Sequence, residues 1–243
     1  MAIELEGSPV PSTASAPAGD PGRRPALLVF DVNETLSDMG PLRQRFAEVG
    51  APTGLMGVWF AGLLRDGFAL TATGDNEAFA HLAEDGLQVT FHGLSLDRDV
   101  DSAVQHVMEG LPSLGVHPDV VEGVRALAEC GLRLVTLSNG SSGIAEKLLE
   151  EAGVRDRFEA LLSVEDAALW KPAKESYAYA LDRCGVDAAD SMLVAAHPWD
   201  THGASRAGLM SAWVNRTGAP YPSYFAAPDV TVSTLSELAE HLA

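Results

Sequence analysis

Side chains that could take part in covalent catalysis follow apolar runs in this sequence. Asp31 comes directly after Ala-Leu-Leu-Val-Phe, and Ser138 and His197 follow similar runs. Lys171 lies in a Trp-Lys-Pro segment. A carboxylate fixed at such a position can attack an electrophilic carbon or phosphorus atom and form an ester or an acyl phosphate, which divides one difficult displacement into two easier steps. We therefore predict that Asp31 is a nucleophile.

The neighbouring candidates supply what such a nucleophile needs. Lys171 would keep Asp31 ionised and hold an anionic substrate, unless it is an ordinary surface lysine. Ser138, Asn139 and the backbone N–H groups around Gly140 leave a strand for a helix, which is a suitable cradle for a carboxylate or phosphate. Helix capping is the alternative for Ser138, and the two functions use the same geometry.

Thr35 and Asp200 complete the set. Thr35 could donate a hydrogen bond to Asp31 or to a developing charge, whereas Asp200 stands near a predicted helix start, where capping is an equal alternative. Asp31 itself lies in Asp-Val-Asn-Glu-Thr, a segment rich in turn-forming residues, so a turn or cap residue is the alternative for it. The whole set, more than any one member, indicates a catalytic site.

The surrounding pattern predicts an α/β fold, an open, doubly wound, Rossmann-like parallel sheet. Short continuous apolar runs are typical of strands buried on both faces, and here they alternate with helix-like stretches. The predicted strands are 26–30, 132–137, 161–164, 192–196, 211–215 and 230–232, and the predicted helices are 120–130, 143–152, 174–184 and 201–208. Because the carboxyl ends of parallel strands meet at one edge, the candidate residues should converge there.

One stretch interrupts the alternation. Helical periodicity without a buried strand predicts helices at 42–49, 55–66, 76–84 and 100–111. We interpret 43–114 as a helical cap inserted after the first strand, which would exclude water from the site. The catalytic core is then 25–42 with 115–243. Residues 1–24, rich in Pro, Ser, Gly and Ala, are expected to form a disordered tail.

Composition excludes several classes of protein. A formal net charge of -18 without basic clusters argues against binding to nucleic acid or to anionic membranes. No apolar run reaches the length of a transmembrane helix. The two cysteines have no metal-ligand spacing and fit a reducing compartment, so a cytoplasmic location is expected.

Four segments together resemble the motifs of the haloacid dehalogenase superfamily, in the same order and with the insertion between the first two. The four segments are Phe30-Asp31-Val32-Asn33-Glu34-Thr35-Leu36, Leu134-Val135-Thr136-Leu137-Ser138-Asn139, Trp170-Lys171-Pro172 with Tyr177, and Ala195-Ala196-His197-Pro198-Trp199-Asp200. The resemblance covers residues 25–230 and is strongest to the type II 2-haloacid dehalogenases.

That superfamily also contains phosphatases, and two positions of the sequence distinguish a phosphatase from a dehalogenase. Phosphatases have an acid two residues after the nucleophile, where this chain has Asn33, which cannot supply a proton by ionising. They also hold Mg²⁺ with acids of the fourth motif, which here begins with His197 and offers only Asp200. The resemblance therefore implies dehalogenation of a small 2-substituted carboxylic acid without a cofactor. A Mg²⁺-dependent phosphatase is kept as an alternative.

The resemblance also implies further site residues. Tyr177 would position the substrate or Lys171, Asn139 and Trp199 would lie near the halogen, and Asp200 would orient the lytic water. For Tyr177 and Trp199, core packing is equally consistent.

Two departures from the family stand out. Its halide-binding Arg follows a Trp, but here Phe60 follows Trp59 and the nearest alternative is Arg65. The family's Asn in the fourth motif is replaced by His197, which we predict accepts a proton from the lytic water. Without a halide cradle, opening of azetidine-2-carboxylate is an alternative activity, and an inactive binding protein on the same fold is another.

The oligomeric state is open. The resemblance implies pairing through the cap, so a homodimer is one interpretation of the apolar cluster Trp59-Phe60 and Leu63-Leu64. Core packing is the other.

Overall fold

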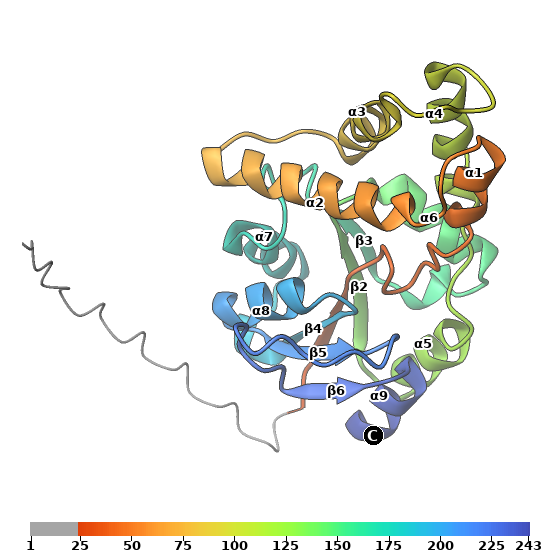
Figure 1. The fold of residues 1–243 in the computed structure, drawn as a ribbon. Helices are drawn as coiled ribbons and strands as arrows, with labels where there is room; N and C mark the ends of the chain where they lie inside the picture. The colour runs from red at the N-terminus through yellow and green to blue at the C-terminus, as the bar shows by residue number, and fades with distance from the viewer. Residues whose placement is uncertain (1–23) are drawn as a thin grey trace, which may run out of the picture.

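Six parallel strands form one sheet in the computed structural model, which describes residues 24–243 (Figure 1). The strands are β1 (Leu27–Phe30), β2 (Arg133–Ser138), β3 (Ala160–Ser163), β4 (Ser191–Ala195), β5 (Met210–Val214) and β6 (Val230–Val232). Their order is β3-β2-β1-β4-β5-β6, and all neighbours pair in parallel. The predicted doubly wound sheet is therefore confirmed, with all six predicted strands present.

The position of β1 in this order explains why a ligand site forms after it. The chain runs from β1 to β2 and β3 on one side, and then crosses to β4, β5 and β6 on the other. In an open α/β sheet, the crevice at such a reversal, beyond the carboxyl ends of the strands, is the usual ligand site. Asp31 follows β1 and His197 follows β4, so the two residues flank this crevice.

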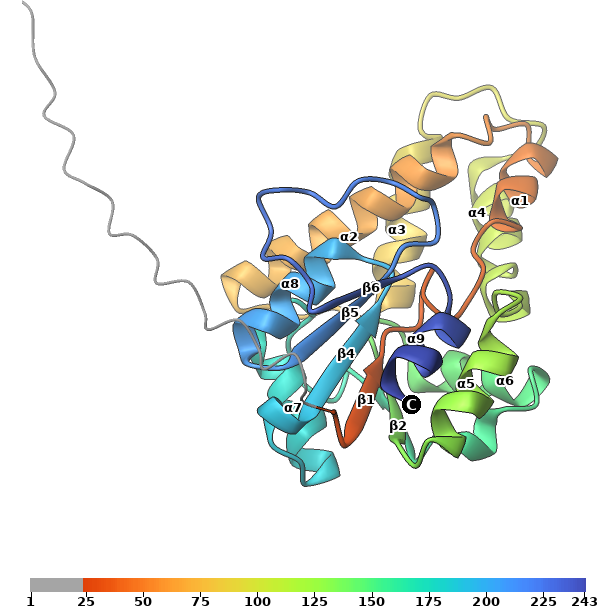
Figure 2. The same cartoon turned by 90° about the horizontal axis from the view of Figure 1, so that it is seen from below.

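Helices cover both faces of the sheet (Figure 2). They are α5 (Val120–Glu129), α6 (Ser142–Glu151), α7 (Lys174–Cys184), α8 (Pro198–Ala207) and α9 (Leu235–Leu242). One apolar cluster joins the sheet to α5, α6 and α9, and another joins it to α7 and α8. Both faces of every central strand are thus buried, as the continuous apolar runs predict.

The predicted helical insertion lies between β1 and β2. Its helices are α1 (Leu42–Glu48), α2 (Leu55–Thr73), α3 (Phe79–Phe91) and α4 (Val100–Met108), followed by a short 3₁₀ turn at Leu111–Ser113. Its apolar side chains belong to the same cluster as α7 and α8. The insertion therefore shares a core with the sheet, and the division into a core and a cap at 43–114 stays a prediction. The predicted tail, 1–24, lies outside the described residues except for Arg24.

Several element bounds differ from those predicted. Helix α2 continues beyond 66, through Gly67, a weak helix former that lies against the ring of Trp170, where a Cβ atom would come within 2.5 Å of a ring carbon. Helix α3 begins and ends later than the predicted 76–84. Helix α8 begins at Pro198, a residue favoured at the first helical position. Helix α9 was not predicted, although Thr234 and Glu237 carry the spacing of a capping box.

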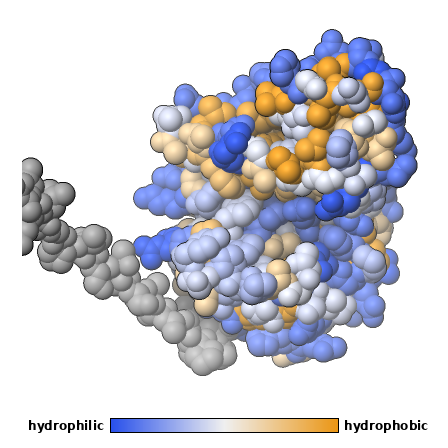
Figure 3. All heavy atoms as spheres, in the orientation of Figure 1, coloured by the Kyte–Doolittle hydropathy of each residue, from blue (hydrophilic) through white to orange (hydrophobic). Residues whose placement is uncertain are grey.

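The interpretation of the Trp59 cluster as a dimer surface is wrong. Trp59, Phe60 and Leu63 are at most 5% exposed, and the indole N–H of Trp59 donates to the carbonyl of Ala83 at 2.9 Å. These side chains are buried, Trp59 against other residues of the insertion and Phe60 towards His197 of the core, as the core-packing alternative expects. Hydrophobic atoms do gather over the insertion in Figure 3, but a homodimer stays a prediction. Across residues 24–243, the helices include none with the length and apolar character to span a membrane.

Candidate active site

Asp31 and Lys171 meet beyond the carboxyl ends of β1 and β3. The Lys171 ammonium nitrogen lies 2.9 Å from Asp31 Oδ1, and the lysine side chain is fully buried while that of Asp31 is 6% exposed. Burial disfavours the carboxylate, but the Lys171 charge and hydrogen bonds from His197 and Thr35 keep the pKa of Asp31 well below its usual range. Asp31 is therefore ionised, as a nucleophile must be.

Asp200 is the second carboxylate that binds the Lys171 ammonium. Its Oδ2 accepts from Lys171 at 2.7 Å, and its Oδ1 accepts the phenol of Tyr177 at 2.6 Å. Burial and nearby Asp31 raise the pKa of Asp200 against the opposing effect of Lys171. Burial and the Asp200 charge also hold the pKa of Tyr177 well above its usual value, so the phenol stays a donor. Asp200 binds Lys171 and Tyr177 in place of capping α8.

Thr35 and His197 both contact the second oxygen of Asp31. Thr35 Oγ1 donates to Oδ2 at 2.7 Å, as expected, and His197 Nδ1 lies 3.1 Å from the same oxygen. The other ring nitrogen, Nε2, lies 3.0 Å from Oε2 of Glu34. The imidazole thus bridges two carboxylates.

This bridge sets the charge of His197. Burial works against the imidazolium, but the hydrogen bonds and charges of Asp31 and Glu34 outweigh it and raise the pKa of His197 to about 9. Below that pH both ring nitrogens are donors. A doubly protonated ring in this bridge has no free lone pair, so the arrangement does not support His197 as the base for the lytic water, and that role stays a prediction.

A family model described as haloacid dehalogenase-like hydrolase matches residues 26–208. The chain belongs to the haloacid dehalogenase-like hydrolases. The match includes all four motif segments that carry Asp31, Ser138, Lys171 and His197.

Relatives of this hydrolase act on halogenated acids. It is 29% identical over 215 residues to the (S)-2-haloacid dehalogenase of Pseudomonas sp. (strain YL), covering 88% of this chain and 92% of that protein. It is 32% identical over 165 residues to haloacetate dehalogenase H-2 of Moraxella sp. (strain B), covering 68% and 73%. An L-2-haloacid dehalogenase structure from Xanthobacter autotrophicus with chloropropionic acid covalently bound superposes with a TM-score of 0.78 at 26% identity, covering 88% and 97%.

The segment after β2 holds Lys171 in place in this hydrolase. The Asn139 side chain accepts the backbone N–H of Lys171 at 3.0 Å and donates to its carbonyl at 3.3 Å. The Ser138 hydroxyl accepts the N–H of Gly140 at 2.9 Å, whereas Ser141 caps α6. The Ser138 proton stays available for an acceptor such as a substrate carboxylate. Contact of Asn139 with a halogen stays a prediction.

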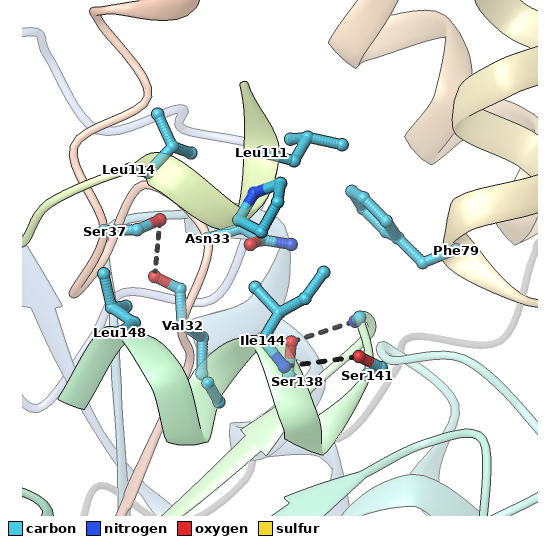
Figure 4. Close-up of a pocket in the computed structure, with 13 residues that line it drawn as sticks. Val32, Asn33, Ser37, Phe79, Leu111, Leu114, Ser138, Ser141, Ile144 and Leu148 are labelled. Carbon is cyan, nitrogen blue, oxygen red and sulfur yellow. Dashed lines mark hydrogen bonds between the residues drawn. The ribbon is translucent and has the colours of Figure 1, made fainter. Parts of the chain in front are cut away.

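A small pocket lies beside these residues, between the core and the insertion (Figure 4). Asn33 stands in its middle, with Ser138 from the core below and Leu111 and Phe79 from the insertion around it. Its volume of about 20 Å³ is room for a water molecule and too little for an organic acid. Asp31 does not line it, so this pocket does not itself open onto the carboxylate.

Aromatic side chains of α2 cover the His197 side. The Phe60 and His197 ring centroids are 6.3 Å apart, and Trp199 stacks on His197 at 5.2 Å while Phe68 meets Trp199 edge-on at 4.9 Å. Arg65, the suggested alternative for the family arginine, is 74% exposed and paired with Asp66. The insertion therefore presents an apolar surface, without an arginine, to the site.

Glu34 is the site residue that sequence reasoning missed. Its side chain is 42% exposed, and its backbone has a φ of 60°, a left-handed conformation that a residue with a side chain seldom adopts. The local sequence offers Glu34 only as one of several turn formers. Its partner His197 is 163 positions away, so only the parallel pairing of β1 with β4 brings the two together.

The donors around Asp31 do not fit a Mg²⁺ ion. Its carboxylate oxygens face an ammonium, a hydroxyl and a protonated imidazole, whereas Mg²⁺ is bound by oxygen atoms that donate lone pairs to it, such as those of carboxylates and carbonyls. In residues 24–243, no group of three or more His, Cys, Asp or Glu side chains is arranged to hold a metal ion.

Proposed function

We propose that this enzyme hydrolyses a small 2-substituted carboxylic acid, foremost a 2-haloacid, through an ester on Asp31. The observation that carries the proposal is the ionised, buried Asp31 carboxylate bonded to Lys171 at 2.9 Å. Such a carboxylate in a site shielded from water is a capable nucleophile. The relatives' names supply the substrate class.

The reaction has two steps. An oxygen of Asp31 attacks C2, the bond from C2 to the halogen breaks with inversion, and halide leaves with the bonding electrons. Water then adds to the Asp31 carbonyl carbon and releases the 2-hydroxy acid, one proton of the water going to the product oxygen and one to solvent. Asn33 is no obstacle, because halide needs no proton to leave.

Substrate binding would use the free donors around the nucleophile. The Ser138 hydroxyl and the Lys171 ammonium would hold the substrate carboxylate, so that charge is matched locally in a protein with a net charge of -18. Asp200 is the residue proposed to orient the lytic water. Its pKa, raised by burial, makes it the more basic of the two buried carboxylates, which suits that role.

Azetidine-2-carboxylate is a second candidate substrate. The buried Phe60 stands where the family resemblance implies an arginine for the halide, and a leaving group tethered in a strained ring needs no such cradle. Attack of Asp31 on C2 of the ring in its protonated ammonium form would break the bond from C2 to nitrogen, so that nitrogen leaves as a neutral amine on the open chain and C2 is held as an ester on Asp31.

Incubation with both classes of substrate tests the proposal. The enzyme is mixed with each 2-chloropropionate enantiomer, with azetidine-2-carboxylate and with p-nitrophenyl phosphate, with and without Mg²⁺. We expect chloride release with one enantiomer and a transient mass gain on Asp31, both abolished in Asp31→Asn. Ring opening without chloride release would favour the second candidate, and phosphate release that depends on Mg²⁺ would contradict both.

A further inference from the structure

The two oxygens of the Asp31 carboxylate have unequal hydrogen bonding. Oδ2 accepts from Thr35 at 2.7 Å and from His197 at 3.1 Å, whereas Oδ1 accepts only from Lys171, at 2.9 Å, within residues 24–243. The Thr35 oxygen itself accepts the N–H of Ala196 at 2.9 Å, so its single proton is directed to Asp31. A carboxylate oxygen has two in-plane lone pairs. Those of Oδ2 are occupied, and Oδ1 retains one for attack.

His197 is held firmly in its place beside Oδ2. Glu34 binds the far nitrogen of the ring at 3.0 Å, and the ring stacks on Trp199. A ring nitrogen of His117 lies 3.0 Å from the backbone carbonyl of Glu34, which is fixed in the left-handed conformation. That conformation is unfavourable for a residue with a Cβ atom. The surrounding structure thus maintains an unfavourable backbone at the residue that clamps His197.

We propose that His197 and Thr35 form the oxyanion site for hydrolysis of the Asp31 ester, with Glu34 as the positioning residue for His197. This inference rests on the proposed function. Oδ1 is the attacking oxygen, and in the ester it is bonded to C2 of the substrate. Oδ2 becomes the ester carbonyl oxygen, still facing both donors.

Hydrolysis then places charge where these donors point. Water adds to Cγ of Asp31 and loses one proton to solvent, and the electrons of the carbonyl bond move to Oδ2. The Thr35 hydroxyl and the His197 N–H stabilise this negative charge. When the carbonyl re-forms, the bond from Cγ to Oδ1 breaks, and the departing oxygen takes the proton of the added hydroxyl. The products are the 2-hydroxy acid and the Asp31 carboxylate.

Ester formation and ester hydrolysis should respond differently to loss of His197. During attack the charge of Asp31 is lost, so a cation at Oδ2 gives no advantage, whereas during hydrolysis charge appears on Oδ2. Removal of one oxyanion donor typically slows a reaction by about 10²- to 10³-fold. The proposal therefore predicts a defect confined to the second step.

Rapid-quench single turnovers followed by intact-protein mass measurement separate the two steps. With the 2-chloropropionate enantiomer that wild type accepts, we expect His197→Ala, which leaves no donor at this position, to slow ester hydrolysis about 100-fold and ester formation less than tenfold. The Asp31 ester should then accumulate. Glu34→Gln should slow hydrolysis about tenfold. Its matched control is Glu48→Gln, because Glu48 is 41% exposed and pairs with His106 at 2.7 Å in the insertion, and it should match wild type.

The outcomes separate the two proposals. If wild type forms no ester on Asp31, the proposed function fails. If wild type forms it but both variants hydrolyse it at the wild-type rate, or slow its formation more than its hydrolysis, the oxyanion assignment is overturned. Urea unfolding midpoints of the variants show whether His197→Ala has lost its fold, in which case Glu34→Gln, altered at a half-exposed carboxylate, decides.

Discussion

Two regions of the site differ in their exposure to solvent. Lys171 and Asp200, on one side of the Asp31 carboxylate, are fully buried at 0% exposure, whereas His197 and Glu34, on the other side, are partly exposed to solvent, at 12% and 42%. Charges in the first pair cannot be replaced by water, so their loss should affect folding and catalysis together. The second pair can exchange hydrogen-bond partners with solvent, so its loss should cost less stability than loss of the first pair.

Replacement of Lys171 should give the largest effect. Lys171→Met leaves Asp31 and Asp200 buried without a cation, which should cost about 3–5 kcal/mol in the free energy of unfolding. Both carboxyls would take up protons, since their pKa values rise without the ammonium, and turnover should be lost. Urea unfolding at pH 7 measures the first effect. Lys174→Met, at an exposed lysine of α7, is the control, and equal midpoints for the two variants would contradict the comparison.

The titration of His197 should give an intermediate effect on stability. Its pKa is about 9 in the folded protein and near 6.5 when unfolded. The folded state thus binds the extra proton, so the stabilisation is complete below pH 6.5 and is lost as the pH rises through 9. This interval corresponds to at most about 3 kcal/mol. Urea midpoints at pH 6.5 and 9.5 should differ more in wild type than in His197→Asn. Parallel pH profiles for the two proteins would refute the assigned charge.

Loss of the Tyr177 hydroxyl should give the smallest effect. Tyr177→Phe removes the contacts of the hydroxyl with Asp200, at 2.6 Å to Oδ1 and 3.2 Å to the backbone carbonyl, which should cost about 1–3 kcal/mol because the nearer acceptor is a buried charge. Thermal unfolding at pH 7 measures it. Tyr179→Phe removes a longer bond of 3.4 Å to Asp166 near the surface and should change stability by less than about 0.5 kcal/mol. If Tyr179→Phe were the more destabilising change, burial would not explain how much each hydrogen bond contributes to stability.

The well-predicted features are those that depend on local pattern. The apolar runs before Asp31 and His197 are buried strands of a parallel sheet, and parallel strands must bring their following loops to one edge. That is why the meeting of Asp31 with Lys171 could be expected from residues 140 positions apart. Helix lengths were less predictable. The glycine at position 67 of α2 packs against the Trp170 ring, which lies far away in the sequence.

The charge of His197 could not be expected from the sequence. An imidazole with an ordinary pKa is a base near neutral pH, and that property motivated its predicted function. The structure instead surrounds it with Asp31 and Glu34, and the second of these contacts requires a left-handed backbone at a residue other than glycine. Nothing in the local sequence signals that conformation. The protonation state of a side chain whose neighbours come from distant loops is therefore difficult to predict from the sequence pattern.

The missing side chain at Gly67 also governs how near the two halves of the molecule can come. An added methyl group there would be 2.5 Å from a carbon of the Trp170 ring, one residue before the lysine. Any larger residue would act as a wedge that lifts the middle of α2 away from the strand ends. The close packing of α2 over the reacting atoms thus depends on the absence of a Cβ atom at Gly67.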